Sequence, residues 1–171
     1  MSRLIIFSTL SVVCCAYALT RGGAPERIGT VILIANFQLS RWVVAPFDAL
    51  FGKVEWAMFA VDLTAFVALY VMSLFSARYW PIWIAAVQGV VALTHLAGLW
   101  TDFIIPWAYG NAVALWSYVL LAMLAVATWR HRVRLRRYGI DPAWRGQLPP
   151  SYREGQSAGD ARFPDSVGTG R

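Results

Sequence analysis

Long apolar runs separated by short polar links dominate this chain. A helix that crosses a membrane needs about 20 mostly apolar residues, within a range of about 17 to 25. Hydrophobic residues make up 58% of the 171 positions and charged residues 14%, whereas soluble domains average about 45–50% and about 25%. A water-soluble fold of this composition would have too few polar residues to cover its surface. We therefore predict an all-α fold, a polytopic transmembrane helical bundle.

The apolar runs predict five membrane spans and one bundle domain over residues 1–138. The spans are expected at residues 4–19, 28–45, 56–76, 82–100 and 107–129. Pro46, Pro81 and Pro106 fall at span boundaries, where the missing N–H of proline disturbs a helix least. The bundle domain ends in a basic juxtamembrane segment after Trp129.

The first run has a second interpretation as a cleaved signal peptide, which would leave four spans. Arg3 would supply its basic start, and residues 16–18 read Ala-Tyr-Ala, a small-residue cleavage pattern. With five spans, eight basic residues lie on the side of the C-terminal arginines and three on the other. Because basic residues favour the cytoplasmic side, we predict a multi-pass protein of a cell inner membrane, with the N-terminus outside and the C-terminus cytoplasmic.

Aromatic residues near the span ends agree with this topology. Tryptophan and tyrosine favour the interface between membrane and water, because their rings are apolar and their polar atoms need a partner. The outer belt is expected to contain Trp42, Trp56, Trp100 and Trp107, and the inner belt Tyr79, Trp80, Trp83 and Trp129.

A cluster of arginines follows the fifth span. Basic residues directly after a span indicate contact with anionic lipids of the inner leaflet, and each contributes about 1 kcal/mol near the surface. This position argues against a nucleic-acid partner. The predicted lipid-binding residues are Arg130, Arg132, Arg134, Arg136 and Arg137.

The last part of the chain, residues 139–171, is rich in Gly, Pro, Ser and charge. Such a composition buries too little apolar surface to offset its ordering entropy, so a disordered cytoplasmic tail is expected. Residues 149–152 read Pro-Pro-Ser-Tyr, which matches the short pattern of WW-domain ligands but is also typical of a solvated proline turn.

Polar residues inside the spans mark the candidate site. An ionisable group at the centre of a membrane helix costs about 2.5–3.5 kcal/mol on insertion scales, so it usually finds a partner. In the five-span topology Arg41, Asp62 and His95 lie at one level in the outer leaflet. Gln88, His95 and Asp102 are spaced by seven residues and form one stripe of the fourth span. The ligand or proton-relay candidates are Arg41, Asp62, Gln88, His95 and Asp102.

We expect His95 to face the bundle interior and to pair with Asp62, with Arg41, Gln88 and Asn36 as further neighbours. One interpretation is a structural clamp that sets helix register, with about 0.6 to 2 kcal/mol from each hydrogen bond in a membrane. The other is a proton-relay or ligand site, because a histidine beside a carboxylate titrates near neutral pH.

The sequence contains no motif for binding a metal ion or a cofactor. His131 is the only other histidine, at the far end of the fifth span, so one haem cannot use both. Cys14 and Cys15 are neighbours in an apolar run and point about 100° apart on a helix, which argues against a disulfide. Glu26 stands beside Arg27 in a Gly- and Pro-containing link, and a solvated pair is expected. No metal, cofactor or catalytic residue is predicted.

Three classes of function remain open. The first is a small non-enzymatic membrane protein, an accessory or assembly partner of a larger complex or a homo-oligomer. The second is a transporter or proton-coupled small-molecule carrier built on Arg41, Asp62, Gln88 and His95. The third is a membrane-embedded enzyme that uses His95 with Asp62. A water-filled cavity at these side chains would favour the last two classes over the first.

Overall fold

The computed structural model describes residues 2–43, 56–96 and 106–147. These residues form the helices α1 (Ser2–Arg21), α2 (Ala24–Val43), α3 (Trp56–Phe75), α4 (Trp80–Thr94) and α5 (Pro106–Tyr138), followed by a short 3-10 helix (Arg145–Gln147). The described part of the chain contains no named strand and one isolated β-bridge, between Ser76 and Trp144. The all-α fold predicted from the sequence is thus present.

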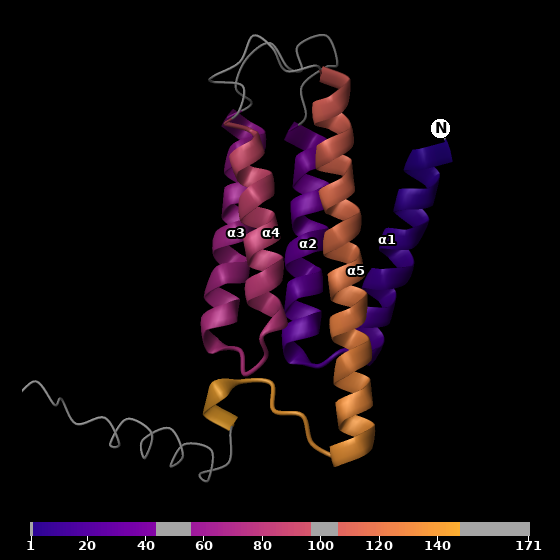
Figure 1. Cartoon of the computed structure of the whole chain (residues 1–171), viewed down its shortest axis with the longest axis vertical. Helices are drawn as coiled ribbons and strands as arrows, with labels where there is room; N and C mark the ends of the chain where they lie inside the picture. Colours follow the sequence, from indigo (N-terminus) through magenta and orange to yellow (C-terminus); the bar gives the residue numbers. More distant parts are fainter. Residues whose placement is uncertain (1, 44–55, 97–105, 148–171) are drawn as a thin grey trace, which may run out of the picture.

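The helices run along one common direction and lie side by side (Figure 1). α3 packs most extensively against α4, and α1 packs against α5 and α2. α1 leans away from its neighbours toward its N-terminal end (Figure 1). The α1–α2 and α3–α4 links, together with the end of α5, occupy the lower end of the bundle in that view.

Prolines and a glycine set several helix ends. Pro81 lies in the first turn of α4 and Pro106 begins α5, where the missing N–H breaks no intrahelical bond. α5 ends before Gly139, whose φ of 72° is left-handed, and its N–H donates to Leu135 O at 3.0 Å. This geometry is the glycine-terminated helix end that an L residue adopts only with strain.

The central core contains residues from all five helices, with Ala18 as the contribution of α1. Leu69, Ile84 and Leu124 are completely buried within it. A smaller cluster of Cys14, Cys15 and Leu121 holds α1 against α5. Both cysteines are free thiols, and they contribute apolar packing in this position.

Polar side chains are buried while many large apolar side chains are exposed. Among the side chains with essentially no exposure are Gln88, Glu26, Thr30 and Thr128. In contrast, several large apolar side chains are each at least 49% exposed, among them Ile5, Val12, Val31, Val67 and Leu93. A water-soluble protein normally has the opposite distribution.

By length and composition, α3 is the one helix among the described residues that can cross a membrane. Only 28% of its most apolar stretch is buried inside the protein, which is unlike the core helix of a soluble domain. α1 has a shorter apolar part, α4 ends at Thr94, and α2 carries Glu26, Arg27 and Arg41. The described helices therefore support one span, and the count of five stays a prediction.

The boundary predicted for the disordered tail needs correction. Residues 139–147 fold back under the bundle, where Ala77 N–H donates to Ala143 O at 3.1 Å and Arg145 Nε donates to Ser76 O at 3.3 Å. The composition of this segment did not indicate that it packs against the bundle, because a few specific polar contacts hold it there in place of a large apolar surface. Residues 148–171, including the Pro-Pro-Ser-Tyr sequence, lie outside the described residues.

Candidate functional site

Asp62 is the centre of a buried polar cluster that joins three helices. His95 Nε2 donates to Asp62 Oδ2 at 2.8 Å, and Gln88 Nε2 donates to Asp62 Oδ1 at 2.8 Å. Asn36 Nδ2 donates to the same Oδ1 at 3.0 Å. The carboxylate on α3 therefore binds one side chain from α2, one from α4 and His95 just after α4. An ionised carboxylate only accepts, so Nε2 of His95 carries a proton in this contact.

The buried environment makes these contacts strong and their loss costly. Asp62, Gln88 and His95 are at most 6% exposed, and charge-assisted hydrogen bonds are roughly twice as strong as neutral ones. Two acceptor atoms in the cluster, Gln88 Oε1 and Asn36 Oδ1, are buried and have no hydrogen-bond partner in the described structure. Chemically the cluster can clamp helices or hold a proton between His95 and Asp62.

Two predicted site residues remain, Arg41 and Asp102. Arg41 is exposed on α2 and makes no hydrogen bond or ion pair with any part of the chain that the structure describes. The structure thus brings Asp62, Gln88 and His95 together with Asn36, but leaves Arg41 out of the cluster. Asp102 lies outside the described residues.

A second buried network, centred on Arg78, occupies the opposite end of the bundle. Arg78 Nη1 forms an ion pair with Glu26 Oε2, and Arg78 Nη2 lies 3.0 Å from Asp141 Oδ2. His131 Nδ1 is 2.6 Å from the same Asp141 oxygen, and Trp80 Nε1 donates to Glu26 Oε1 at 3.0 Å. The Arg78 network therefore joins the start of α2 and the α3–α4 link to α5 and to the segment after it.

The sequence-based interpretation of Glu26 as a solvated partner of Arg27 is wrong. Glu26 is completely buried and pairs with Arg78, whereas Arg27 Nε donates to Gly22 O at 3.1 Å. Gly23 makes room for the pair, because a Cβ there would lie 3.1 Å from Arg78 Nη1 and Nη2. A comparison of residue depths, which identified Asp62 and His95, would also have placed Glu26 and Arg78 at one level.

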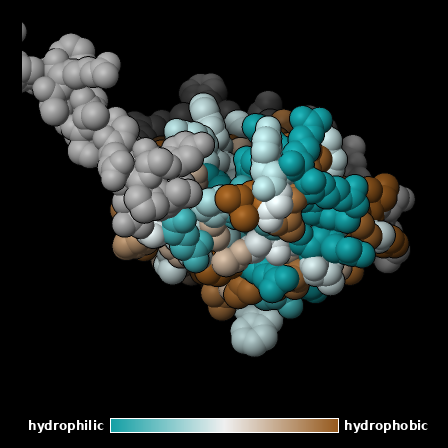
Figure 2. Space-filling view, turned by 90° about the horizontal axis from the view of Figure 1, so that it is seen from below, coloured by the Kyte–Doolittle hydropathy of each residue, from teal (hydrophilic) through white to brown (hydrophobic). Residues whose placement is uncertain are grey.

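The predicted lipid-binding arginines have mixed surroundings. Arg134 Nε lies 3.1 Å from Asp141 Oδ1, so this residue belongs to the Arg78 network. Arg130, Arg136 and Arg137 are exposed, and Arg132 is half-buried. Viewed from this end, hydrophilic side chains gather over a large part of the face, with apolar side chains beside them (Figure 2).

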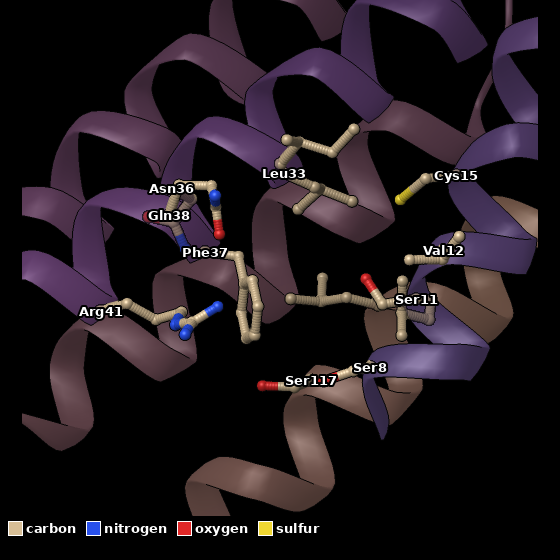
Figure 3. A pocket seen from close by; sticks show the side chains of 13 residues that line it. Ser8, Ser11, Val12, Cys15, Leu33, Asn36, Phe37, Gln38, Arg41 and Ser117 are labelled. Carbon is tan, nitrogen blue, oxygen red and sulfur yellow. The ribbon is translucent and has the colours of Figure 1, made fainter. Parts of the chain in front are cut away.

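A cavity of about 340 Å³ lies between α1, α2 and α5 (Figure 3). Asn36 lines it and is the contact between this cavity and the Asp62 cluster. Neither Asp62 nor His95 lines this cavity or the more open groove between α2 and α3. Among the described residues, no group of three His, Cys, Asp or Glu side chains lies close enough together to hold a metal ion.

Comparison of the chain with protein-family models, with curated proteins and with solved structures finds no match in any of the three.

Proposed function

We propose that this chain is a multi-pass membrane protein in which α1 to α5 all cross the bilayer. The distribution of side chains supports this proposal: apolar residues face outward from every helix, while Glu26, Asp62 and Gln88 are buried. In a bilayer, ionisable side chains face the bundle interior and pair there. Short helices such as α4 cross when flanking residues extend the span or the bilayer adapts.

The proposed orientation places the N-terminus outside and the C-terminus in the cytoplasm of a cell with an inner membrane. The exposed arginines at the end of α5 support this orientation, because positive charge favours the cytoplasmic side and its anionic lipids. Exposed aromatic residues at the two ends agree with it: Trp42 and Trp56 at one end, and Tyr79, Trp83 and Trp129 at the other. Trp80 is an exception to the predicted belt because it turns inward to Glu26.

For the activity, we propose a non-enzymatic accessory or assembly partner of a larger membrane complex. One observation carries this choice: Asp62 accepts hydrogen bonds from side chains of α2 and α4 and from His95, and neither Asp62 nor His95 lines the cavity beside α1 or the groove between α2 and α3. A relay exchanges protons with water and needs such a cavity, whereas a clamp needs only the contacts. The Arg78 network clamps the other end in the same way.

Proton flux into liposomes tests the clamp against the relay. We expect the full-length protein, reconstituted in liposomes under a pH gradient, to give no flux above that of empty liposomes. Asp62→Asn should be destabilised only modestly, by the loss of charge assistance, because the oxygen of the new amide can accept from Gln88 and Asn36 while its nitrogen donates to the other tautomer of His95. Asp62→Leu should be strongly destabilised, because it leaves three donors unpaired.

Flux that Asp62→Asn abolishes would overturn the clamp and establish a carrier. The assembly role has its own test, native mass spectrometry of the protein extracted from its source membrane. We expect one stoichiometric protein partner, and a chain that is always recovered alone would refute this part of the proposal.

One observation favours the carrier as the second candidate. Asn36 both lines the cavity beside α1 and donates to Asp62, so one side chain contacts both the cavity and the carboxylate. In a carrier, Arg41 would attract the substrate and the pair of Asp62 and His95 would take the proton. The enzyme alternative, with His95 and Asp62 as a base pair, has no comparable support.

A further inference from the structure

The cavity beside α1 has the size and lining of a ligand site. Its volume of about 340 Å³ falls within the range of about 300–1,000 Å³ typical of small-molecule sites. Apolar side chains, including Leu33, Phe37 and Leu121, supply most of its lining. Figure 3 shows Phe37 between the two sides of the cavity, with Leu33 and Cys15 at one part of its wall.

The cavity is elongated along the bundle. Its α2 lining extends from Leu33 to Arg41, which corresponds to roughly 12 Å at about 1.5 Å of rise per residue. α1 contributes Ser8, Ser11 and Val12 along the same length. A narrow apolar volume of this shape fits an extended alkyl chain better than a compact polar molecule.

One end of the cavity carries a positive charge that no described side chain pairs with. Arg41 lines the cavity, makes no ion pair within the described structure, and has its guanidinium beside Phe37 (Figure 3). Among the described residues that line the cavity, none is acidic. Guanidinium groups bind phosphate through paired hydrogen bonds, so the complementary ligand carries a net negative phosphate and no ammonium group.

We propose that this cavity is a site for one anionic phospholipid, with an acyl chain along α1, α2 and α5 and the phosphate at Arg41. The proposal rests on the multi-pass topology above, which places Arg41 at the outer surface of the bilayer. There the long arginine side chain reaches the headgroup level while its stem stays in apolar surroundings.

Lipid titration followed by native mass spectrometry tests the proposal on the full-length protein. The probes are phosphatidylglycerol and phosphatidylethanolamine with identical acyl chains. We expect the first phosphatidylglycerol to bind about tenfold more tightly than phosphatidylethanolamine, because the ammonium of phosphatidylethanolamine competes with Arg41 for its phosphate and phosphatidylglycerol has no such group. Arg41→Gln should abolish this preference, and Arg41→Lys should keep most of it because the charge remains.

A second pair of variants tests the chain-binding part. Ser8→Trp adds bulk at an exposed lining position of α1 and should weaken binding of the first lipid about tenfold, whereas Ile6→Trp, at an exposed position that does not line the cavity, should leave it unchanged. Equal affinities for the two lipids, or a preference that survives Arg41→Gln, would overturn the proposal. A dimer that forms after delipidation and ignores added phosphatidylglycerol would show that a second copy covers the cavity, which also overturns it.

The membrane topology can fail separately. If carbonate washing releases the protein from membranes without detergent, the multi-pass proposal is wrong, and the lipid site that depends on it is wrong as well. If the protein needs detergent but shows no lipid preference, only the lipid site is wrong.

Discussion

Replacement of Arg78 by methionine should destabilise the protein more than any single change on its surface. Arg78 is 7% exposed and is the shared cation of two acids, Glu26 and Asp141. Methionine keeps the long apolar stem but removes the charge and every donor. Among the described residues, Glu26 then has no cation beside it although it is completely buried, and Asp141 keeps Arg134 and His131 nearby.

The magnitude follows from the burial of both acids. Removing one partner of a buried ion pair costs about 3–5 kcal/mol, because the other charge stays desolvated and uncompensated. Removing Glu26 as well should recover part of this loss, so Glu26→Gln combined with Arg78→Met should be more stable than the two separate losses add up to. The difference between the loss in the double variant and the sum of the two single losses is the interaction energy between Glu26 and Arg78.

Equilibrium unfolding of the full-length protein in mixed micelles of increasing SDS content gives the free energy of unfolding for each variant. Arg130→Met is the matched control, because Arg130 is exposed and lies at the same end; a surface change of this kind stays within about 0.5 kcal/mol. Arg27→Met tests the solvated-pair interpretation and should cost no more than its one hydrogen bond contributes, about 0.5–1.5 kcal/mol. Equal losses for Arg27→Met and Arg78→Met would refute the reasoning.

A second readout follows the segment after α5. Arg78 Nη2 donates to Asp141 O at 3.1 Å and holds the segment that contains Arg145 under the bundle. Limited trypsin digestion should therefore cleave after Arg145 faster in Arg78→Met than in Arg130→Met. An unchanged cleavage rate would mean that the segment docks without Arg78.

Two further changes test the lower end of the bundle. Trp80→Phe removes the indole donor to Glu26 Oε1. It should lower the free energy of unfolding by about 1.5–3 kcal/mol, the usual contribution of a hydrogen bond to a charged group. The same SDS titration measures this loss, and a loss below about 0.5 kcal/mol, the range of an ordinary surface change, would contradict the prediction. Gly139→Ala places a side chain at φ 72° with no neighbour within 4 Å, so it should cost about 1–2 kcal/mol through the backbone alone. Gly146→Ala is its matched control, because a Cβ there also meets open space and φ is not positive, and equal effects of the two would contradict the backbone explanation.

The sequence predicted the helices well because local physics sets them. Apolar runs and prolines placed four of the five helix starts within a few residues, including Trp56 for α3 and Pro106 for α5. Depth is also a local property, since it depends only on the distance along a helix from its end. The level shared by Asp62 and His95 was therefore predictable, and the structure places these side chains in contact, with Gln88 beside them.

Which helix faces meet is a property of the tertiary structure. Arg41 shares the expected depth of Asp62 but points to the cavity beside α1, because the direction of a side chain around its helix has meaning only once the neighbouring helices are placed. Glu26 has Arg27 beside it in the sequence and yet pairs with Arg78, which lies in the link between α3 and α4. The composition of residues 139–147 indicated disorder, but Asp141 docks because Arg78 and His131 offer it buried partners. Sequence periodicity determined what each helix is and how deep each group lies. The packing of α1 to α5 decided which charges pair, as Glu26 and Arg78 do, and which, like Arg41, have no ion-pair partner among the described residues.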